Sequence, residues 1–396
     1  MVLAGFLTMS VYLDYQSAKP LDPRVLEAML PYFSEEFGNP SSLHKEGDAA
    51  STVLEDARRT VAAWINAAPD EIIFTSGATE ANNLALIGYA FRNRNRGNHL
   101  IISEIEHISL HNIAKYLERN GFRVSRVPVD RFGRVSLSKL QARITPETIL
   151  ISVGYASNEI GTVQPVQEIG ALARARGIAF HSDGVAAEGL LNIDVQRDNV
   201  DLLSLSANDI YGPRGVGALY VRQGVRLNPL IIGGGQEKGL RSGSENIPGI
   251  VGMARAAAIM SREMAGEVPR FQAYRDKLIA GVLAAIPHSH LNGHPVERLA
   301  NNAHFRFQGV EGESLLLSLK QKGISAMTGS ACTARTLEPS HTLMSIGLLH
   351  EEAHGSLEFT CGRFTREEDI DRVLEVLPGV VERLRKVSPI YQGNEG

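Results

Sequence analysis

The chain alternates short apolar runs with stretches of helical periodicity, and this alternation restricts its fold more than any other feature. Seven runs predict buried β-strands: EIIFTSG, HLIISEI, FRVSRVPV, TILISVGYA, AFHSD, VDLLSLSA and GALYVR. Between them, apolar residues recur at i, i+3 and i+4 over 78–93, 109–120, 136–144 and 165–176. The alternation predicts an α/β fold, in which helices flank a mostly parallel sheet.

The pattern changes after the helix predicted over 245–264. A helix over 274–286, strands over 301–308 and 356–361, and a long terminal helix over 366–387 predict a smaller α+β domain. We therefore expect three parts: an N-terminal segment, residues 1–20, that joins the small domain, a large domain over 21–265, and a small C-terminal domain over 266–396.

Composition excludes several classes of function. The 40 Lys and Arg residues against 44 Asp and Glu give a net charge of −4, and no basic run predicts nucleic-acid binding. The apolar runs are shorter than the roughly 18 residues that cross a membrane, and residues 1–15 lack the basic start of a signal peptide. Two cysteines in 396 residues fit a reducing compartment, so we expect a cytoplasmic protein.

Polar residues follow several predicted strands at their carboxyl ends, where open α/β sheets bind ligands. Asn208 and Asp209 come after VDLLSLSA, His107 follows HLIISEI, and Asp183 ends AFHSD. Each alone has a structural explanation, because a lone histidine is more often structural and an aspartate after a strand more often caps a helix. Their occurrence at one sheet edge favours a functional site. The turn TSGATEANN adds backbone amides suited to phosphate.

Two further segments, one rich in glycine and one around Cys332, can be interpreted as ordinary surface loops or as functional segments. The run GGGQEKGLRSGSEN, 233–246, fits an ordinary surface loop as well as a binding segment. Small residues surround Cys332 in TGSACTAR, which favours an exposed loop and an accessible thiol. Cys361, in the apolar run SLEFTC, is expected to be buried.

Seven motifs in order resemble those of the NifS/IscS-type cysteine desulfurases of the class V aminotransferase family. They are FGNPSSLH, FTSGATEANN, SNEIGTVQP, GGGQEKGLRSGSEN, GSACTAR, LEPSHTLMSIGL and GRFTREEDIDRVLEVLP, and the resemblance covers roughly residues 11–391. It implies a PLP-dependent transferase type I fold, a homodimer, and sulfur delivery to an IscU-type scaffold protein for iron–sulfur clusters. In such enzymes a lysine holds pyridoxal phosphate (PLP) as a Schiff base, and a loop cysteine takes sulfur from the substrate as a persulfide.

The resemblance also implies roles for individual residues. Asp183 would contact the pyridine nitrogen of PLP, His107 would stack over the ring, and Asn158 would lie near the phenolate oxygen. Cys332 would carry the persulfide. The phosphate would be held by Thr79, Ser206 and, from the neighbouring subunit, Ser244.

Three positions depart from the family pattern. Where the family has Ser-x-His-Lys before a Gly-Pro turn, this chain has Ser206-Ala207-Asn208-Asp209, so the Schiff-base lysine is missing. The family glutamine near the phenolate aligns with Ala186, and the arginine that binds the substrate carboxylate aligns with Glu358. At about 5 Å and an effective dielectric near 20, Glu358 would repel that carboxylate by roughly 3 kcal/mol.

One lysine is gained near the expected pocket. The segment DYQSAKP carries Lys19 where relatives usually have a sequence closer to Asp-x-x-Ala-Thr-Thr-Pro. Lys19 could be a solvated loop residue, the commonest state of lysines, form an ion pair with Asp209 or Glu358, or act as a surrogate amine. Of the last two we favour the ion pair, because nothing in the sequence indicates a depressed lysine pKa.

These observations predict a desulfurase-like protein of iron–sulfur cluster assembly that lacks lysine-dependent PLP desulfuration. PLP would bind non-covalently, and Cys332 would carry sulfur from sulfide or another donor, or ligate a cluster shared with the scaffold. A second hypothesis is an active PLP enzyme, a cysteine desulfurase or lyase, that uses Lys19 or His107 as its base. A third is a non-catalytic regulatory binding partner that does not need Cys332. The acids near His107 could also suggest a metal site, but no ligand spacing supports one.

Overall fold

A seven-stranded sheet forms the centre of the larger part of the molecule. The computed structural model describes residues 10–328, 339–389 and 391. The sheet has the strand order β2-β8-β7-β6-β5-β3-β4, and only β8 runs antiparallel to its neighbours. In that order the strands are Ile72–Thr75, Gly217–Val221, Leu202–Ser206, Ala179–Asp183, Thr148–Ser152, His99–Ser103 and Arg123–Val127. The predicted α/β fold with a mostly parallel sheet is confirmed.

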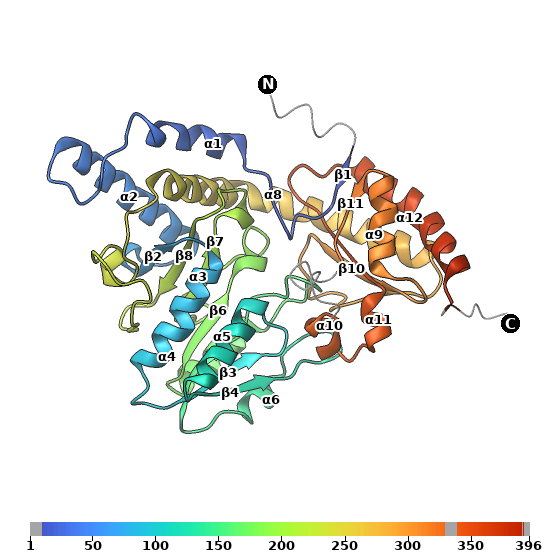
Figure 1. The fold of residues 1–396 in the computed structure, drawn as a ribbon, viewed down its shortest axis with the longest axis horizontal. Coiled ribbons are helices and arrows are strands. Elements are labelled where there is room, and N and C mark those ends of the chain that lie inside the picture. The colour runs from blue at the N-terminus through green and yellow to red at the C-terminus, as the bar shows by residue number, and fades with distance from the viewer. Residues whose placement is uncertain (1–9, 329–338, 390, 392–396) are drawn as a thin grey trace.

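Helices cover both faces of this sheet, and all its strands except the edge strand β4 are buried on both sides (Figure 1). Ile72 and Phe74 of β2 face one core with residues of α2, α7 and α8. Ile73, between them, faces the other core with residues of α3 to α5. The helices of this part are α1 Pro23–Met29, α2 Lys45–Trp64, α3 Ala78–Asn83, α4 Tyr89–Arg92, α5 Ile108–Arg119, α6 Leu137–Gln141 and α7 Val166–Ala175.

Short turns of tighter or wider helix join these elements. A π-helical turn, η3 Leu84–Gly88, makes α3 and α4 continuous. The 3-10 turns are η1 Leu30–Phe33, η2 Pro69–Glu71, η4 Val185–Ala187, η5 Asn208–Ile210 and η6 Glu237–Gly239. Two of them, η4 and η5, follow the carboxyl ends of β6 and β7 and so set the direction of the side chains at that sheet edge.

A single 39-residue helix, α8 Ile247–Ala285, runs from the large sheet to the C-terminal part of the chain (Figure 1). The sequence predicted two helices here, over 245–264 and 274–286. Pro269 lies inside α8, and a proline in a helix removes one backbone hydrogen bond. Both ends of α8 are nevertheless packed, because Met253 belongs to a core of the large sheet and Leu278 to the core of the C-terminal part. The expected domain boundary near residue 266 falls inside this helix.

A smaller α+β unit follows α8. Its three-stranded antiparallel sheet has β10 Asn302–Phe307 between β12 Ser356–Thr360 and β9 Ser289–Leu291. Its helices are α9 Gly312–Gln321, α10 His341–Ser345, α11 His350–His354 and α12 Glu367–Val387. The smaller α+β unit predicted from the sequence is therefore present.

The N-terminal segment packs against this smaller unit. Strand β1 Val11–Tyr12 pairs in parallel with β11 Ile324–Ser325, and Leu13 is fully buried in the core of the small unit. Asp14 then forms a β-bridge with Thr360 at the end of β12. The chain thus passes from the small unit to the large one through residues 14–22.

No helix among the described residues is long and apolar enough to cross a membrane.

Candidate functional site

A cavity of about 470 Å³ lies between the carboxyl ends of the parallel strands and the small unit. The segments that follow β2, β3, β5, β6 and β7, with the last residues of β3, β6 and β7, contribute most of its wall. The N-terminal segment adds Gln16 and Ser17, and the small unit adds Met327, His341 and Glu358. The predicted location of a ligand site at the sheet edge is therefore matched by a cavity large enough for a small organic molecule.

Most of the predicted site residues line this one cavity, although they are far apart in the sequence. They are Thr79, His107, Asn158, Asp183, Ala186, Ser206, Asn208, Asp209 and Glu358. Lys19 lies beside the cavity without lining it, and Ser244 is exposed away from it. Cys332 falls within 329–338, outside the described residues.

The turn between β2 and α3 leaves open space at the cavity. Gly77, the residue before α3, has φ +144°, and no atom lies within 4 Å of the position that a Cβ would occupy. Thr79, in the first turn of α3, is exposed, and Ser206 ends β7 on the same cavity wall. The free amides of a helix start and two hydroxyl groups form an arrangement that suits a phosphate.

A chain of hydrogen bonds fixes Asp183 and His107. The Oδ2 atom of Asp183 accepts a 2.8 Å hydrogen bond from Nδ2 of Asn82, and Oδ1 accepts one of 3.1 Å from the Val185 amide. Nδ2 of Asn82 also lies 3.3 Å from the Ser109 hydroxyl oxygen, which is 2.8 Å from Nδ1 of His107. The carboxylate and the imidazole are thus held at fixed orientations on the cavity wall.

Asp209 is buried in η5, directly after β7. Burial raises the pKa of its carboxyl group, although the charge of Lys19 and a hydrogen bond from Ser206 act against this rise. Lys19 donates a hydrogen bond to the main-chain carbonyl of Asp209. Its ammonium nitrogen also lies 5.6 Å from the centre of the Tyr211 ring. The expected ion pair with the carboxylate of Asp209 or Glu358 is not formed, because the amine binds the main-chain oxygen instead.

Lys19 nevertheless belongs to a small buried charge group. Burial lowers the pKa of Lys19, against the opposing effects of Asp209 and Glu188. Glu188 is 1% exposed and accepts a 2.8 Å hydrogen bond from the Ser206 amide, but its second carboxyl oxygen has no partner. Burial, followed by the charge of Asp209, raises the pKa of Glu188 well above its ordinary value. One lysine therefore faces two buried carboxyl groups.

Glu358 lies on β12, at the side of the cavity formed by the small unit. It is 4% exposed, and its backbone forms a β-bridge with Met327. Burial and the neighbouring Glu159 raise the pKa of Glu358 well above its ordinary value. Ala186, in η4 after β6 of the large sheet, contributes only a methyl group to the cavity wall. Neither side chain can donate a charged hydrogen bond to a substrate carboxylate.

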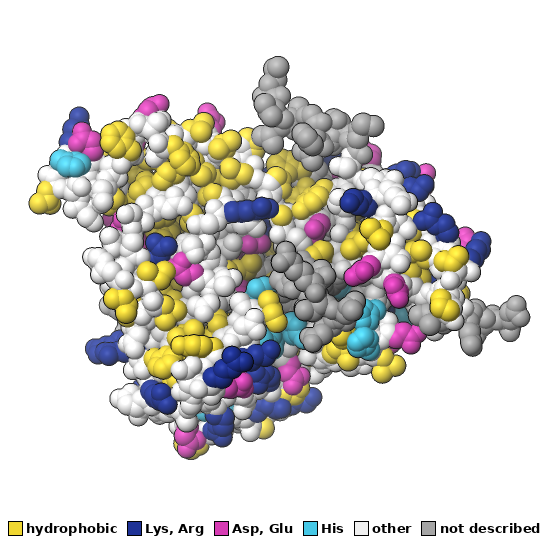
Figure 2. All heavy atoms as spheres, in the orientation of Figure 1, with side chains coloured by type: hydrophobic (Ala, Val, Ile, Leu, Met, Phe, Trp, Pro, Cys, Tyr) yellow, Lys and Arg dark blue, Asp and Glu magenta, His cyan; other side chains and the backbone are white. Residues whose placement is uncertain are grey.

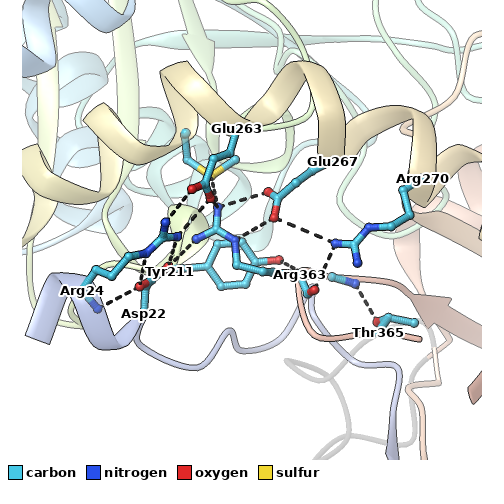
Figure 3. Close-up of polar contacts among 10 residues, drawn as sticks. Asp22, Arg24, Tyr211, Glu263, Glu267, Arg270, Arg363 and Thr365 are labelled. Atoms are coloured by element: carbon cyan, nitrogen blue, oxygen red, sulfur yellow. Dashed lines mark hydrogen bonds and ion pairs between the residues drawn. The ribbon is translucent and has the colours of Figure 1, made fainter.

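A second network, shown in Figure 3, ties the same region to α8. The guanidinium group of Arg363 contacts Asp22 at 2.5 Å, Glu267 at 2.7 Å and Glu263 at 3.2 Å. It lies 4.6 Å from the centre of the Tyr211 ring, whose hydroxyl accepts a 2.7 Å hydrogen bond from the Arg363 amide. This network joins the N-terminal segment, α8 and the chain after β12.

Sequence analysis missed three of the buried acids at the site. Glu106 and Glu159 line the cavity, and Glu188 lies behind Asp209. Burial raises the pKa of both Glu106 and Glu159 to about 8. Glu159 lies within the family motif SNEIG, which gave a signal for its place near the site. Its burial could not be predicted without the fold.

Comparison with known proteins agrees with this arrangement. Residues 11–373 match the family model described as aminotransferase class-V. The chain therefore belongs to the class V aminotransferase family. Over 381 residues it is 56% identical to cysteine desulfurase IscS 1 of Archaeoglobus fulgidus, a match that covers 96% of this chain and 99% of that protein. It is 49% identical over 381 residues to cysteine desulfurase IscS of Methanosarcina thermophila, covering 96% and 94% of the two chains.

These identities assign the chain to the NifS/IscS-type cysteine desulfurases within that family, as the motifs predicted. A solved structure of a NifS-like protein superposes with a TM-score of 0.89 at 34% identity, covering 95% of this chain and all of that one. The PLP-dependent type I fold expected from the resemblance is confirmed, and the family implies PLP as cofactor.

Proposed function

We propose that this chain is a desulfurase-like protein of iron–sulfur cluster assembly that lacks lysine-dependent desulfuration of cysteine. The observation that carries the proposal is the buried carboxyl group of Asp209 at the end of β7, where the family pattern has its lysine. A carboxylate cannot bond covalently to an aldehyde as an amine does. Glu358, at the position of the family arginine, also offers no cation to the carboxylate of cysteine.

In this proposal Cys332 carries sulfur to an IscU-type scaffold protein or ligates a cluster shared with it. A thiolate can take a sulfur atom from a donor persulfide by exchange, which releases the donor thiolate and needs no oxidant. Thiolates are also the usual protein ligands of iron in such clusters. Both roles need an accessible thiol. Cys361 does not provide one, because it is 2% exposed and burial raises the pKa of its thiol to about 12.

The test compares the two cysteines of the chain. Cys332→Ser should abolish cluster formation on the scaffold, followed by visible circular dichroism, while Cys361→Ser, the matched control, should leave the rate nearly unchanged. Equal losses in both variants would contradict the proposal. An unchanged rate in Cys332→Ser would instead support the regulatory partner that binds an active relative without using a thiol.

The cavity retains groups that suit PLP without a covalent bond. When bound, PLP supplies an electron sink for reactions at the carbon next to an amine. Thr79 and Ser206 would hold its phosphate, Asp183 its ring nitrogen and Asn158 the phenolate side, with His107 against the ring. The open space at Gly77 supports this fit. The exposed Ser244 would be supplied by the second subunit of a homodimer.

Exposed apolar residues support the proposed homodimer. Hydrophobic side chains gather over α1 in Figure 2, and Phe33 and Phe37, which follow α1, are 63% and 73% exposed. Such patches mark interaction surfaces more often than chance. Sedimentation analysis of Phe33→Ser and Phe37→Ser together should show a shift toward monomer relative to the unmodified chain, and an unchanged mass would argue against this surface.

The active-enzyme alternative is equally consistent with the names of the relatives, and one observation favours it. Burial lowers the pKa of Lys19, and an amine with a lowered pKa is a better base and nucleophile near neutral pH. Extended dialysis separates the two hypotheses, because PLP held only by hydrogen bonds should be removed. A pyridoxyl group on Lys19 after borohydride reduction, detected by mass spectrometry, would overturn the main proposal and establish the alternative.

A further inference from the structure

The cavity that suits PLP, an anionic cofactor, has carboxyl groups on its wall and no cation beside them. Within the described residues, no lysine or arginine side chain lines it. Several of its acids carry little charge at neutral pH, because burial raises the pKa of Glu106 and Glu159 to about 8 and that of Glu358 well above its ordinary value. The acid that matters most for a phosphate group is therefore Glu80, which lies at the proposed phosphate turn.

Glu80 lies in the first turn of α3 and lines the cavity next to Thr79. Its Oε2 atom accepts a 2.8 Å hydrogen bond from the Ser76 amide. The carboxylate thus fixes the turn between β2 and α3, but it also places a negative charge beside the position proposed for the phosphate. Two negative groups at close range repel each other unless a cation lies beside them.

Arg241 supplies such a cation from outside the cavity wall. Its Nε atom lies 3.1 Å from Oε1 of Glu80, whereas the Ser76 amide binds Oε2. The side chains of Arg241 and Glu80 are 24% and 17% exposed, so the ion pair is partly shielded from water. Among the described residues, this is the only ion pair that Glu80 forms. Arg241 is therefore the cation that neutralises the acid of the phosphate turn.

The loop that carries Arg241 is itself held against β2, the strand that leads into this turn. Glu237, which is 6% exposed, accepts a 2.7 Å hydrogen bond from the Phe74 amide and forms a 2.8 Å ion pair with Arg58. The loop and the phosphate turn are thus joined at two points, through Glu237 and through Arg241. The guanidinium group consequently reaches Glu80 from a backbone that the fold holds in place.

We propose that Arg241 is a positioning residue for the phosphate of the cofactor and that it acts through Glu80. By neutralising this carboxylate, Arg241 allows the turn after β2 to hold a phosphate dianion while Glu80 keeps the Ser76 amide in place. The protein thereby favours PLP over pyridoxal, its form without phosphate, by means of a cation that does not line the cavity. The inference rests on the fit of PLP in the proposed function.

Calorimetric titration of the full chain, freed of cofactor by dialysis, with PLP and with pyridoxal tests the proposal. At low salt, Arg241→Gln should weaken PLP binding about tenfold or more and leave the weaker binding of pyridoxal unchanged. Arg241→Lys, which keeps the charge, should retain most of the affinity for PLP. Lys238→Gln is the matched control, because Lys238 lies on the same loop but donates to the main-chain oxygen of Asp70. It should leave both affinities unchanged.

A second substitution tests whether Arg241 acts through Glu80. Glu80→Gln keeps an oxygen that can accept from the Ser76 amide, and it should leave the affinity for PLP unchanged or raise it. When Glu80→Gln is combined with Arg241→Gln, the affinity should return to within about threefold of that of the unmodified protein. A purely structural role of Arg241, such as holding the loop that carries Ser244, predicts no recovery. Thermal melting of each variant confirms that it is folded.

Several results would overturn the proposal. They are an unchanged PLP affinity in folded Arg241→Gln, an equal loss for pyridoxal, no recovery in the double variant, or no binding of PLP to the unmodified protein. The last result would also contradict the fit of PLP in the proposed function, whereas the first three leave that fit standing. Cys332→Ser should bind PLP normally, so the sulfur-carrier role is tested separately.

Discussion

Two groups of carboxyl side chains contact the chain at and just after β12, and they differ in whether they hold a cation. Arg363 contacts Asp22, Glu263 and Glu267 (Figure 3). Glu358, five residues before Arg363, lines the cavity, and no guanidinium or ammonium group within the described residues contacts its carboxyl group. This part of the small unit thus forms an ion-paired contact with α8 through Arg363 and an acidic part of the cavity wall through Glu358.

The consequence appears in the pKa values of the two groups. Burial alone would raise the pKa of Asp22, but hydrogen bonds from Arg24 and the charges of Arg24 and Arg363 lower it to about 2. Glu159, which has only hydroxyl donors on its carboxyl group, has a pKa raised to about 8. A buried acid beside an arginine stays ionised, whereas one without an arginine keeps its proton.

Removing the cation from the paired group should give the largest effect. Arg363→Ala removes the buried cation from Asp22 and Glu267, with Arg24 still on Asp22, and should lower the free energy of unfolding by about 3 kcal/mol. Urea unfolding at pH 7, followed by far-ultraviolet circular dichroism, measures it. A loss below about 1 kcal/mol, the size expected for surface pairs, would show that the two groups do not differ as described.

Removing a carboxyl group that has no cationic partner should instead stabilise the protein as the pH rises. The pKa of Glu106 is about 8 in the fold against an ordinary 4.5, so the stability it contributes below pH 4.5 is lost between pH 4.5 and pH 8. Glu106→Gln avoids this loss, at most about 1.4 kcal/mol per pH unit. Its melting temperature should therefore gain on the unmodified protein from pH 5 to pH 8, with Glu351→Gln as the unaffected control. Parallel curves for both proteins would argue against a proton on Glu106.

Replacing acids of the cavity wall by cations should change activity, with an effect between those of the other substitutions. Asp209→Lys should make PLP resistant to dialysis, while sulfide release from cysteine with dithiothreitol as acceptor stays slow, because Glu358 still offers no cation to the substrate carboxylate. Adding Glu358→Arg should raise the rate by more than the product of the single effects, a coupling of about 0.5–3 kcal/mol. Full activity in Asp209→Lys alone would show that Glu358 does not oppose the carboxylate. High activity in the unmodified protein would refute the proposed loss of desulfuration.

The smallest effect is expected at the rim of the paired group. Arg24 also contacts Asp22 and Glu263, but its side chain is 43% exposed. Arg24→Ala leaves Arg363 in place and should cost no more than about 1 kcal/mol in the urea titration. A loss equal to that of Arg363→Ala would mean that the difference in burial between the two arginines does not determine their contributions to stability.

The sequence predicted the strands well because most are apolar on both faces and each ends at a clear turn; the edge strand β4, with two arginines, is the exception. All seven expected runs of the large sheet are strands. The joined helix α8 was divided in two because Pro269 and a run of charged residues interrupt its pattern locally. Its continuity depends on packing at both ends, which a local pattern does not contain.

The sequence predicted which residues lie at the cavity where a motif places them at the end of a strand. It predicted less well the residues whose properties depend on burial. Thr79, Asp183 and Ser206 follow from their strands. For Lys19 the sequence left a solvated lysine, an ion pair and a surrogate amine open and favoured the ion pair over the amine. Its hydrogen-bond partner is a main-chain oxygen, which carries no signature in the sequence. Glu188 belongs to the site because it is 1% exposed beside Asp209, which only tertiary structure reveals.

Helix α8 has a consequence for how this molecule unfolds. At 1.5 Å per residue its 39 residues extend about 58 Å, and its two halves are buried in different cores. Fraying that begins in either core shortens the one helix that both cores share, although the hydrogen bond missing at Pro269 divides its ladder. The large and small units should therefore melt together in one calorimetric transition, and cleavage of the backbone near Gly266 would weaken both at once.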